Sequence, residues 1–199
     1  MKHILIDTNP ALVEAWKTCF SDAHDVSIIE GDITQLSVDA IVSPANSFGF
    51  MDGSLDYAIS DKLGWHIEKE LQAKIKASPE GELLVGQAWV LETGHKQIPY
   101  LISAPTMRIP TNFNIDTSVN AYLAMKALLI AAKKDERIHS VAIPGLCTGV
   151  GRMPPAIAAK QMYSAYEEIV LGKKQDFSTF GEAQKYHWNL NQKGMIWTH

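Results

Sequence analysis

The sequence predicts an α/β fold. Short apolar segments alternate with segments whose apolar residues recur at helical spacing, and turn signals separate them. This alternation is typical of a parallel or mixed sheet covered by helices. The chain has 199 residues, 46% hydrophobic and 20% charged, which is enough for one domain with a proper core. The sequence contains no internal repeat or low-complexity linker, so one domain is the simplest interpretation.

The predicted elements alternate from the first residues onward. Thr8-Asn9-Pro10 offers a helix cap with proline in the first turn, directly after an apolar strand. The segment Asp56–Ala77 is predicted to be one long helix because its apolar residues fall near helical spacing. The predicted strands are Lys2–Asp7, Val26–Glu30, Ala40–Ser43, Val85–Glu92, Tyr100–Ser103 and Ser140–Ile143, and the predicted helices are Ala11–Phe20, Asp56–Ala77, Asp116–Lys134 and Pro155–Leu171.

Composition excludes several classes of function. A formal net charge of −4 argues against a nucleic-acid-binding protein, which usually carries a basic face. No apolar run approaches the roughly 20 residues that span a bilayer, and Asp7 comes too early for the apolar region of a signal peptide. Cys19 and Cys147 lack metal-ligand spacing and fit a reducing compartment. We therefore expect a cytoplasmic protein without a metal, a cofactor, or a nucleic-acid or membrane partner.

The segment 173–199 differs from the rest of the chain. Its aromatic residues, among them Tyr186, Trp188 and Trp197, indicate packing against the domain or against a partner. The pattern favours neither. We expect a domain over residues 1–172, which includes the first strand and helix, and a C-terminal tail over residues 173–199.

A glycine-rich loop, Pro144-Gly145-Leu146-Cys147-Thr148-Gly149-Val150-Gly151-Arg152, follows the last predicted strand and precedes a predicted helix. Glycines let a backbone turn sharply and approach a ligand closely. Exposed N–H groups beside a helix N-terminus form an anion seat, which points to phosphate. The alternative is a strand-to-helix connection that is rich in glycine for steric reasons alone.

Three further motifs favour the interpretation of that loop as a ligand-binding loop. They are Gly31-Asp32-Ile33-Thr34, the run Val38–Ser47 that ends in Ser-Pro-Ala-Asn-Ser, and the run Gly49–Ile59. Together with the loop at 145–152, these pieces resemble the macro domain, an ADP-ribose-binding module. The likeness spans about residues 26–171. It implies a three-layer α/β/α fold with a mixed central sheet, here with an added N-terminal strand and helix.

The resemblance gives roles to residues near the first motifs. Asp32 would accept a hydrogen bond from the adenine amino group, with the N–H of Ile33 nearby. The alternative is that Asp32 bonds its own backbone two residues on. Asn46 matches the asparagine that contacts the distal ribose, and its alternative role is a turn residue with a left-handed backbone.

The first loop would contact phosphate and ribose through Gly49, Gly53 and Ser54. Asp56 matches the acid that positions or activates a water in hydrolytic members of the family. Asp52 is a rival for that role. The alternative for Asp56 is a favourable anion at a helix N-terminus.

The second loop would wrap the diphosphate through backbone N–H groups of Gly145, Leu146, Cys147, Thr148, Gly149, Val150 and Gly151. Arg152 would either contact a phosphate or be solvated. No histidine is near Cys147 in sequence, so we interpret it as a neutral residue that lines the loop. Arg108 is expected near the mouth of the site, and Phe113, Tyr163 and the C-terminal aromatics stay open as partners that stack on adenine.

The chain also departs from the family pattern. Ser43-Pro44 stands where macro domains usually have Asn-Ala, and Phe50, Met51 and Asp52 interrupt the usual glycines. Binding needs the two loops and Asp32, whereas turnover also needs Asp56 or Asp52 within reach of an attacking water.

Three functions follow from these observations. The first is binding of ADP-ribose, free or on an ADP-ribosylated protein, with hydrolysis of an ADP-ribosyl carboxylate ester, O-acetyl-ADP-ribose or ADP-ribose 1''-phosphate. The second is a non-catalytic sensor or sequestering module for such nucleotides. The third is an assembly protein that kept the fold and lost the ligand, which the aromatic tail motivates.

Overall fold

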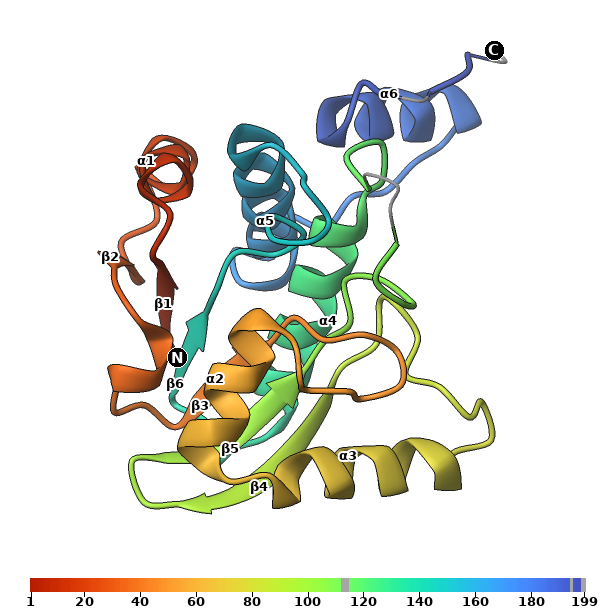
Figure 1. Cartoon of the computed structure of the whole chain (residues 1–199). Coiled ribbons are helices and arrows are strands. Elements are labelled where there is room, and N and C mark those ends of the chain that lie inside the picture. The colour runs from red at the N-terminus through yellow and green to blue at the C-terminus, as the bar shows by residue number, and fades with distance from the viewer. Residues whose placement is uncertain (112–114, 194, 198–199) are drawn as a thin grey trace.

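A six-stranded mixed sheet forms the centre of this computed structural model, which describes residues 1–111, 115–193 and 195–197 (Figure 1). The strands are β1 (Lys2–Asp7), β2 (Val26–Glu30), β3 (Ala40–Ser43), β4 (Trp89–His95), β5 (Ile98–Ser103) and β6 (Ser140–Ile143). Their order is β2-β1-β6-β3-β5-β4, and every neighbouring pair is parallel except β4 and β5. The predicted α/β class with a mixed sheet is confirmed.

Helices cover both faces of the sheet. They are α1 (Pro10–Cys19), α2 (Ser54–Leu63), α3 (His66–Ala77), α4 (Asn120–Lys134), α5 (Pro155–Ile169) and α6 (Phe180–Leu190), with a short 3-10 helix η1 (Ile33–Gln35). One buried cluster joins α1, α4 and α5 to the sheet, and a second joins α2 and α3 to its other face. The result is the predicted three-layer arrangement.

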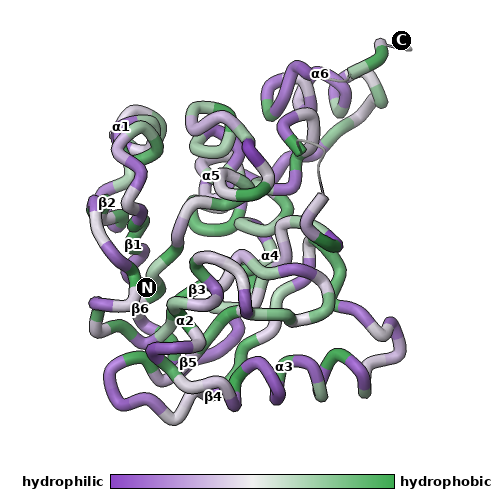
Figure 2. The backbone as a smooth tube through the Cα atoms, in the orientation of Figure 1, coloured by the Kyte–Doolittle hydropathy of each residue, from purple (hydrophilic) through white to green (hydrophobic). Residues whose placement is uncertain are grey.

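Strand alternation explains the two clusters. Leu5 packs in the cluster with α1, α4 and α5, whereas its neighbours Ile4 and Ile6 pack in the cluster with α2 and α3. Because helices cover both faces of the sheet, the parallel strands carry apolar residues on both sides and form continuous apolar runs in the sequence. Helix α3 buries Ile67, Leu71 and Ile75, and its other residues are polar apart from Ala73 and Ala77; Figure 2 shows the alternation along its length.

The predicted helix over Asp56–Ala77 is wrong: α2 ends at Leu63 and α3 begins at His66. Gly64 separates them with φ 102° and ψ 138°, a conformation that side chains other than glycine rarely adopt. Apolar spacing alone did not reveal the break, because it continues on both sides of Gly64.

Other boundaries also moved. The strand predicted over Val85–Glu92 lies at Trp89–His95, because Gly86 adopts φ 95° within a preceding turn. The helix predicted from Asp116 begins at Asn120.

Both ends of the chain contribute elements. Strand β1 lies inside the sheet between β2 and β6, and Trp16 of α1 is fully buried. Helix α6 begins with a capping box in which Thr179 and Glu182 satisfy each other's backbone N–H groups. Among the described residues, no helix is both long and apolar enough to cross a bilayer.

Replacing Gly64 by alanine should lower the free energy of unfolding by about 1–3 kcal/mol, because a side chain there is strained and a Cβ would lie 2.7 Å from Nδ1 of His66. Urea unfolding measures the loss. The control is Gly181→Ala in α6, where φ is not positive and a Cβ would lie no closer than 4.0 Å to Oγ1 of Thr179. Equal effects of the two substitutions would contradict the assignment of the helix break to Gly64.

Candidate functional site

A cavity of about 490 Å³ opens where the parallel strands end. Its wall is formed by residues at or beyond the carboxyl ends of β1, β2, β3, β5 and β6, at positions 6–9, 31–33, 44–46, 106–107, 110 and 144–151 without 146. Residues 50 and 52–56, before and within α2, complete the wall. Ligands of open α/β sheets bind at this edge, and the volume is within the range of about 300–1,000 Å³ typical of small-molecule sites.

The structure brings most of the predicted site residues to this cavity. They come from four separate parts of the chain. The predicted residues that line it are Asp32, Ile33, Asn46, Asp52, Gly53, Ser54, Asp56, Gly145, Cys147, Thr148, Gly149, Val150 and Gly151.

Gly49, Leu146 and Arg152 are not among the lining residues. Gly49 packs against α3, where a Cβ would lie 2.9 Å from Leu71. Leu146 is fully buried in the cluster with α1. Arg152 is exposed and adopts φ 51°.

The carboxyl group of Asp56 lies on the cavity wall in the first turn of α2. Oγ of Ser43, at the end of β3, donates a hydrogen bond of 2.6 Å to its Oδ1. Burial raises the pKa of Asp56 to about 6, and the negative charge of Asp52 acts in the same direction, against the Ser43 hydrogen bond. A carboxylate with such a pKa exchanges protons near neutral pH, as a general base requires.

Ser43 was not predicted as a site residue. It is fully buried, although its Oγ contacts Asp56. Its place one residue before Pro44-Ala45-Asn46, where macro domains usually have an asparagine, was the available signal.

The Asn46 side chain shapes the first loop. Its Nδ2 donates to the carbonyl oxygen of Phe50 at 2.7 Å, and its Oδ1 accepts from the N–H groups of Phe48 at 3.1 Å and Phe50 at 3.3 Å. The amide therefore braces the turn that carries the exposed Phe50 into the cavity wall.

Asp32 caps η1 and also lines the cavity. Its Oδ1 accepts from the N–H of Thr34 at 2.9 Å and from the Thr34 hydroxyl at 2.8 Å. These bonds hold the pKa of Asp32 below its ordinary value. The capping role is thus present in the structure, and the exposed carboxylate keeps its place on the wall.

The second loop has a tightly constrained backbone. The N–H of Gly145 donates to Oδ2 of Asp7 at 3.0 Å, and a Cβ on Gly145 would lie 2.5 Å from Leu12 and from Oγ1 of Thr148. Cys147 adopts φ 66°. Burial raises the pKa of the Cys147 thiol to about 12, so the group stays protonated at neutral pH and is no thiolate nucleophile.

Sequence reasoning missed the contribution of β1 to the site. Asp7, Thr8 and Asn9 line the cavity, and Asp7 also accepts from the N–H of Asn9 at 2.9 Å. An acidic residue at the end of an apolar strand was the signal, but only the sheet order places that end beside Gly145.

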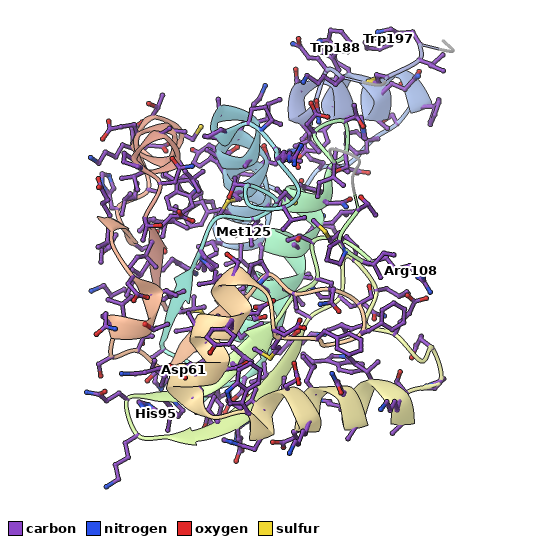
Figure 3. All side chains as sticks on the ribbon, viewed as in Figure 1. Asp61, His95, Arg108, Met125, Trp188 and Trp197 are labelled. Atoms are coloured by element: carbon purple, nitrogen blue, oxygen red, sulfur yellow. The ribbon has the colours of Figure 1, made fainter. Side chains whose placement is uncertain are left out.

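The remaining candidates lie elsewhere. Arg108 pairs with Glu82 at 2.8 Å and lies at the outer edge of the molecule (Figure 3). The hydroxyl of Tyr163 donates to Asp22, and Phe113 lies outside the described residues.

The described lining carries four carboxylates, Asp7, Asp32, Asp52 and Asp56, and no lysine, arginine or histidine. An anionic ligand would therefore have to bind to backbone N–H groups and to neutral side-chain donors such as the hydroxyl of Thr148. Among the described residues, no group of three or more His, Cys, Asp or Glu is arranged to hold a metal ion.

Two bacterial proteins resemble this chain in sequence. An uncharacterised protein of Aquifex aeolicus is 36% identical over 138 residues, which cover 69% of this chain and 78% of that protein. A macro domain-containing protein of Listeria monocytogenes is 33% identical over 138 residues, with 68% and 75% covered.

Solved structures share the fold. The Oceanobacillus iheyensis macrodomain with ADP has a TM-score of 0.57 at 22% identity, and the match covers 71% of this chain and 87% of that one. Variants of the same macrodomain have been solved with substitutions of an asparagine, of a glycine seven residues later (with ADPR) and of an aspartate ten residues after the asparagine.

A family model described as Macro domain matches residues 42–162. That range is more than half of the chain and includes the first loop, α2 and the second loop. The chain belongs to the macro domain family.

Proposed function

We propose that this chain binds ADP-ribose or a close derivative in the cavity and hydrolyses an ester or phosphate bond at its distal ribose. Family membership and the ADP and ADPR complexes of the Oceanobacillus iheyensis macrodomain support the ligand class. The position of the cavity at the carboxyl ends of the parallel strands supports the same assignment.

Residue spacing adds support. Gly53 follows Asn46 by seven residues and Asp56 follows it by ten, which is the spacing of the glycine and the aspartate after the asparagine substituted in the Oceanobacillus iheyensis variants. In this chain all three residues line one cavity.

In the proposed complex, Asp32 accepts a hydrogen bond from the adenine amino group and the N–H of Ile33 lies nearby. Backbone N–H groups of the second loop other than that of Gly145, which donates to Asp7, hold the diphosphate, because no cationic side chain is among the described lining residues. Asn46 orients the distal ribose, near Asp56.

The observation that carries the catalytic proposal is the Asp56 carboxylate on the cavity wall with its pKa raised to about 6. At pH 7 most of this group is ionised and accepts a proton readily. As water adds to the acyl carbon or phosphorus, Asp56 takes a proton from it. The bond to the ribose oxygen breaks, and that oxygen receives the proton that Asp56 took from water, which regenerates the carboxylate.

One observation favours binding without turnover as a second candidate. The Asn46 amide is engaged with the backbone at Phe48 and Phe50, so its groups are committed before a ribose arrives. This candidate would be selected if calorimetry showed high-affinity binding of ADP-ribose and a long incubation with O-acetyl-ADP-ribose gave no product.

Replacing Asp32 by alanine should weaken ADP-ribose binding about tenfold, because a charge-assisted hydrogen bond to the ligand is lost. Calorimetric titration measures the dissociation constant. The control is Glu30→Ala. Glu30 carries the same charge as Asp32, lies two residues before it, is exposed and is not among the residues that line the cavity. A similar loss in both variants would contradict the assignment of this hydrogen bond to Asp32.

Replacing Asp56 by asparagine should lower ester turnover at least about 100-fold while the dissociation constant for ADP-ribose changes little, because only proton transfer is removed. Wild-type turnover should rise with pH through about 6, where the base becomes ionised. In Asp52→Asn this rise should move to lower pH, since a negative charge that raises the pKa of Asp56 is gone. Unchanged turnover in Asp56→Asn would refute the assignment.

Asp56 should also destabilise the folded protein at neutral pH. Its pKa is raised from 3.8 to about 6 on folding, so its stabilising contribution is complete below pH 4 and is lost as pH rises through 6. Asp56→Asn should therefore raise the free energy of unfolding at pH 8 by about 1–3 kcal/mol. This gain should disappear near pH 4 in urea unfolding, and a gain that is independent of pH would contradict the explanation.

A further inference from the structure

The C-terminal segment 180–193, which comprises α6 and the three residues after it, lies outside the range matched by the family model. Polar contacts hold it on the domain. The buried carboxylate of Glu168 on α5 accepts hydrogen bonds from the hydroxyl of Tyr186 on α6 and from Lys126 on α4. Trp188 and Trp197 lie on the outer side of α6, away from the sheet (Figure 3).

Asn191, directly after α6, is 3% exposed. Its Nδ2 donates to two backbone carbonyl oxygens, those of Asp116 at 2.7 Å and Ser118 at 2.9 Å. Lys193 adds an ion pair of 2.6 Å to the Asp116 carboxylate. Gln161, fully buried on α5, donates to the same Ser118 carbonyl at 2.9 Å. Hydrogen bonds and an ion pair from the C-terminal segment and α5 thus fix the backbone of residues 115–120.

The same 115–120 segment contacts the cavity wall at two points. The N–H of Ile115 donates to the carbonyl oxygen of Gly151 at 3.1 Å, and the Ile115 side chain packs where a Cβ on Gly151 would lie 2.8 Å away. Nδ2 of Asn120 donates to the carbonyl oxygen of Thr106 at 2.8 Å. Gly151 and Thr106 both line the cavity.

We propose that Asn191 is a positioning residue for ligand binding: through the 115–120 segment it holds the second loop, residues 145–151, in the shape that presents its N–H groups to the ligand. The ligand assignment rests on the proposed function. The physical reason is that backbone donors bind an anion well only when their directions are fixed beforehand, and this cavity has no cationic side chain among its described residues to compensate.

The sharpest test is Asn191→Asp, which keeps the size of the side chain but turns an acceptor toward two carbonyl oxygens. The matched control is Asn189→Asp, which changes the same charge at an exposed position of α6. Calorimetry gives the dissociation constant for ADP-ribose well below the unfolding temperature of each variant, and hydrogen exchange reports on the amides of residues 145–151.

We expect about tenfold weaker binding and faster exchange of the second loop in Asn191→Asp, with the control within about twofold of wild type. A lower unfolding temperature with unchanged affinity and unchanged loop exchange would overturn the proposal, because Asn191 would then be structural only. If Asn191→Asp does not fold, Lys193→Ala replaces it, with Lys185→Ala as control and a smaller loss expected.

The two proposals fail in different ways. If wild-type protein does not bind ADP-ribose, the proposed function is wrong. Exchange of the second loop still decides the positioning role in that case: faster exchange in Asn191→Asp supports it, and unchanged exchange overturns it.

Discussion

The backbone shape of the second loop is the constraint on which the site depends. Four carboxylates and no cationic side chain are found among the described lining residues, so a diphosphate would have to bind to backbone N–H groups and to neutral side-chain donors such as Thr148. The directions of backbone N–H groups are fixed by the backbone conformation, so a small change in that conformation turns these donors away from the ligand. Several contacts accordingly fix the conformation of this loop. At Gly145, the N–H donates to Asp7, and Leu12 and Thr148 leave no room for a Cβ. At Gly151, the side chain of Ile115 packs against the backbone.

These contacts connect the two ends of the chain to one site. Strand β1 lies between β2 and β6, and its last residue therefore reaches the loop that follows β6. Residues after α6 reach the other end of the same loop through Asp116 and Ser118. Both ends lie outside the range of the family match. The family core supplies the two loops and α2, and the flanking segments of this chain brace the second loop.

The sequence predicted the parts of the site that are encoded locally. Glycines at 145 and 151 and the acids at 32 and 56 were singled out from short motifs, and they line one cavity. Contacts between distant residues had no local signal: Ser43 with Asp56, and Asp7 with Gly145, depend on the sheet order. At Gly64 the local pattern itself was misleading, because it predicted one continuous helix where the structure has two. Its apolar neighbours keep helical spacing, and only its backbone conformation ends the helix.

Chemical shifts of backbone amides during titration with ADP-ribose would show whether the second loop binds this nucleotide. We expect the largest changes at Ile33 and at residues 145–151, with little change in the shallow groove beside Trp89 on β4. Changes confined to other surfaces, or none at millimolar ligand, would contradict the claim that the backbone N–H groups at the carboxyl ends of the strands hold this nucleotide.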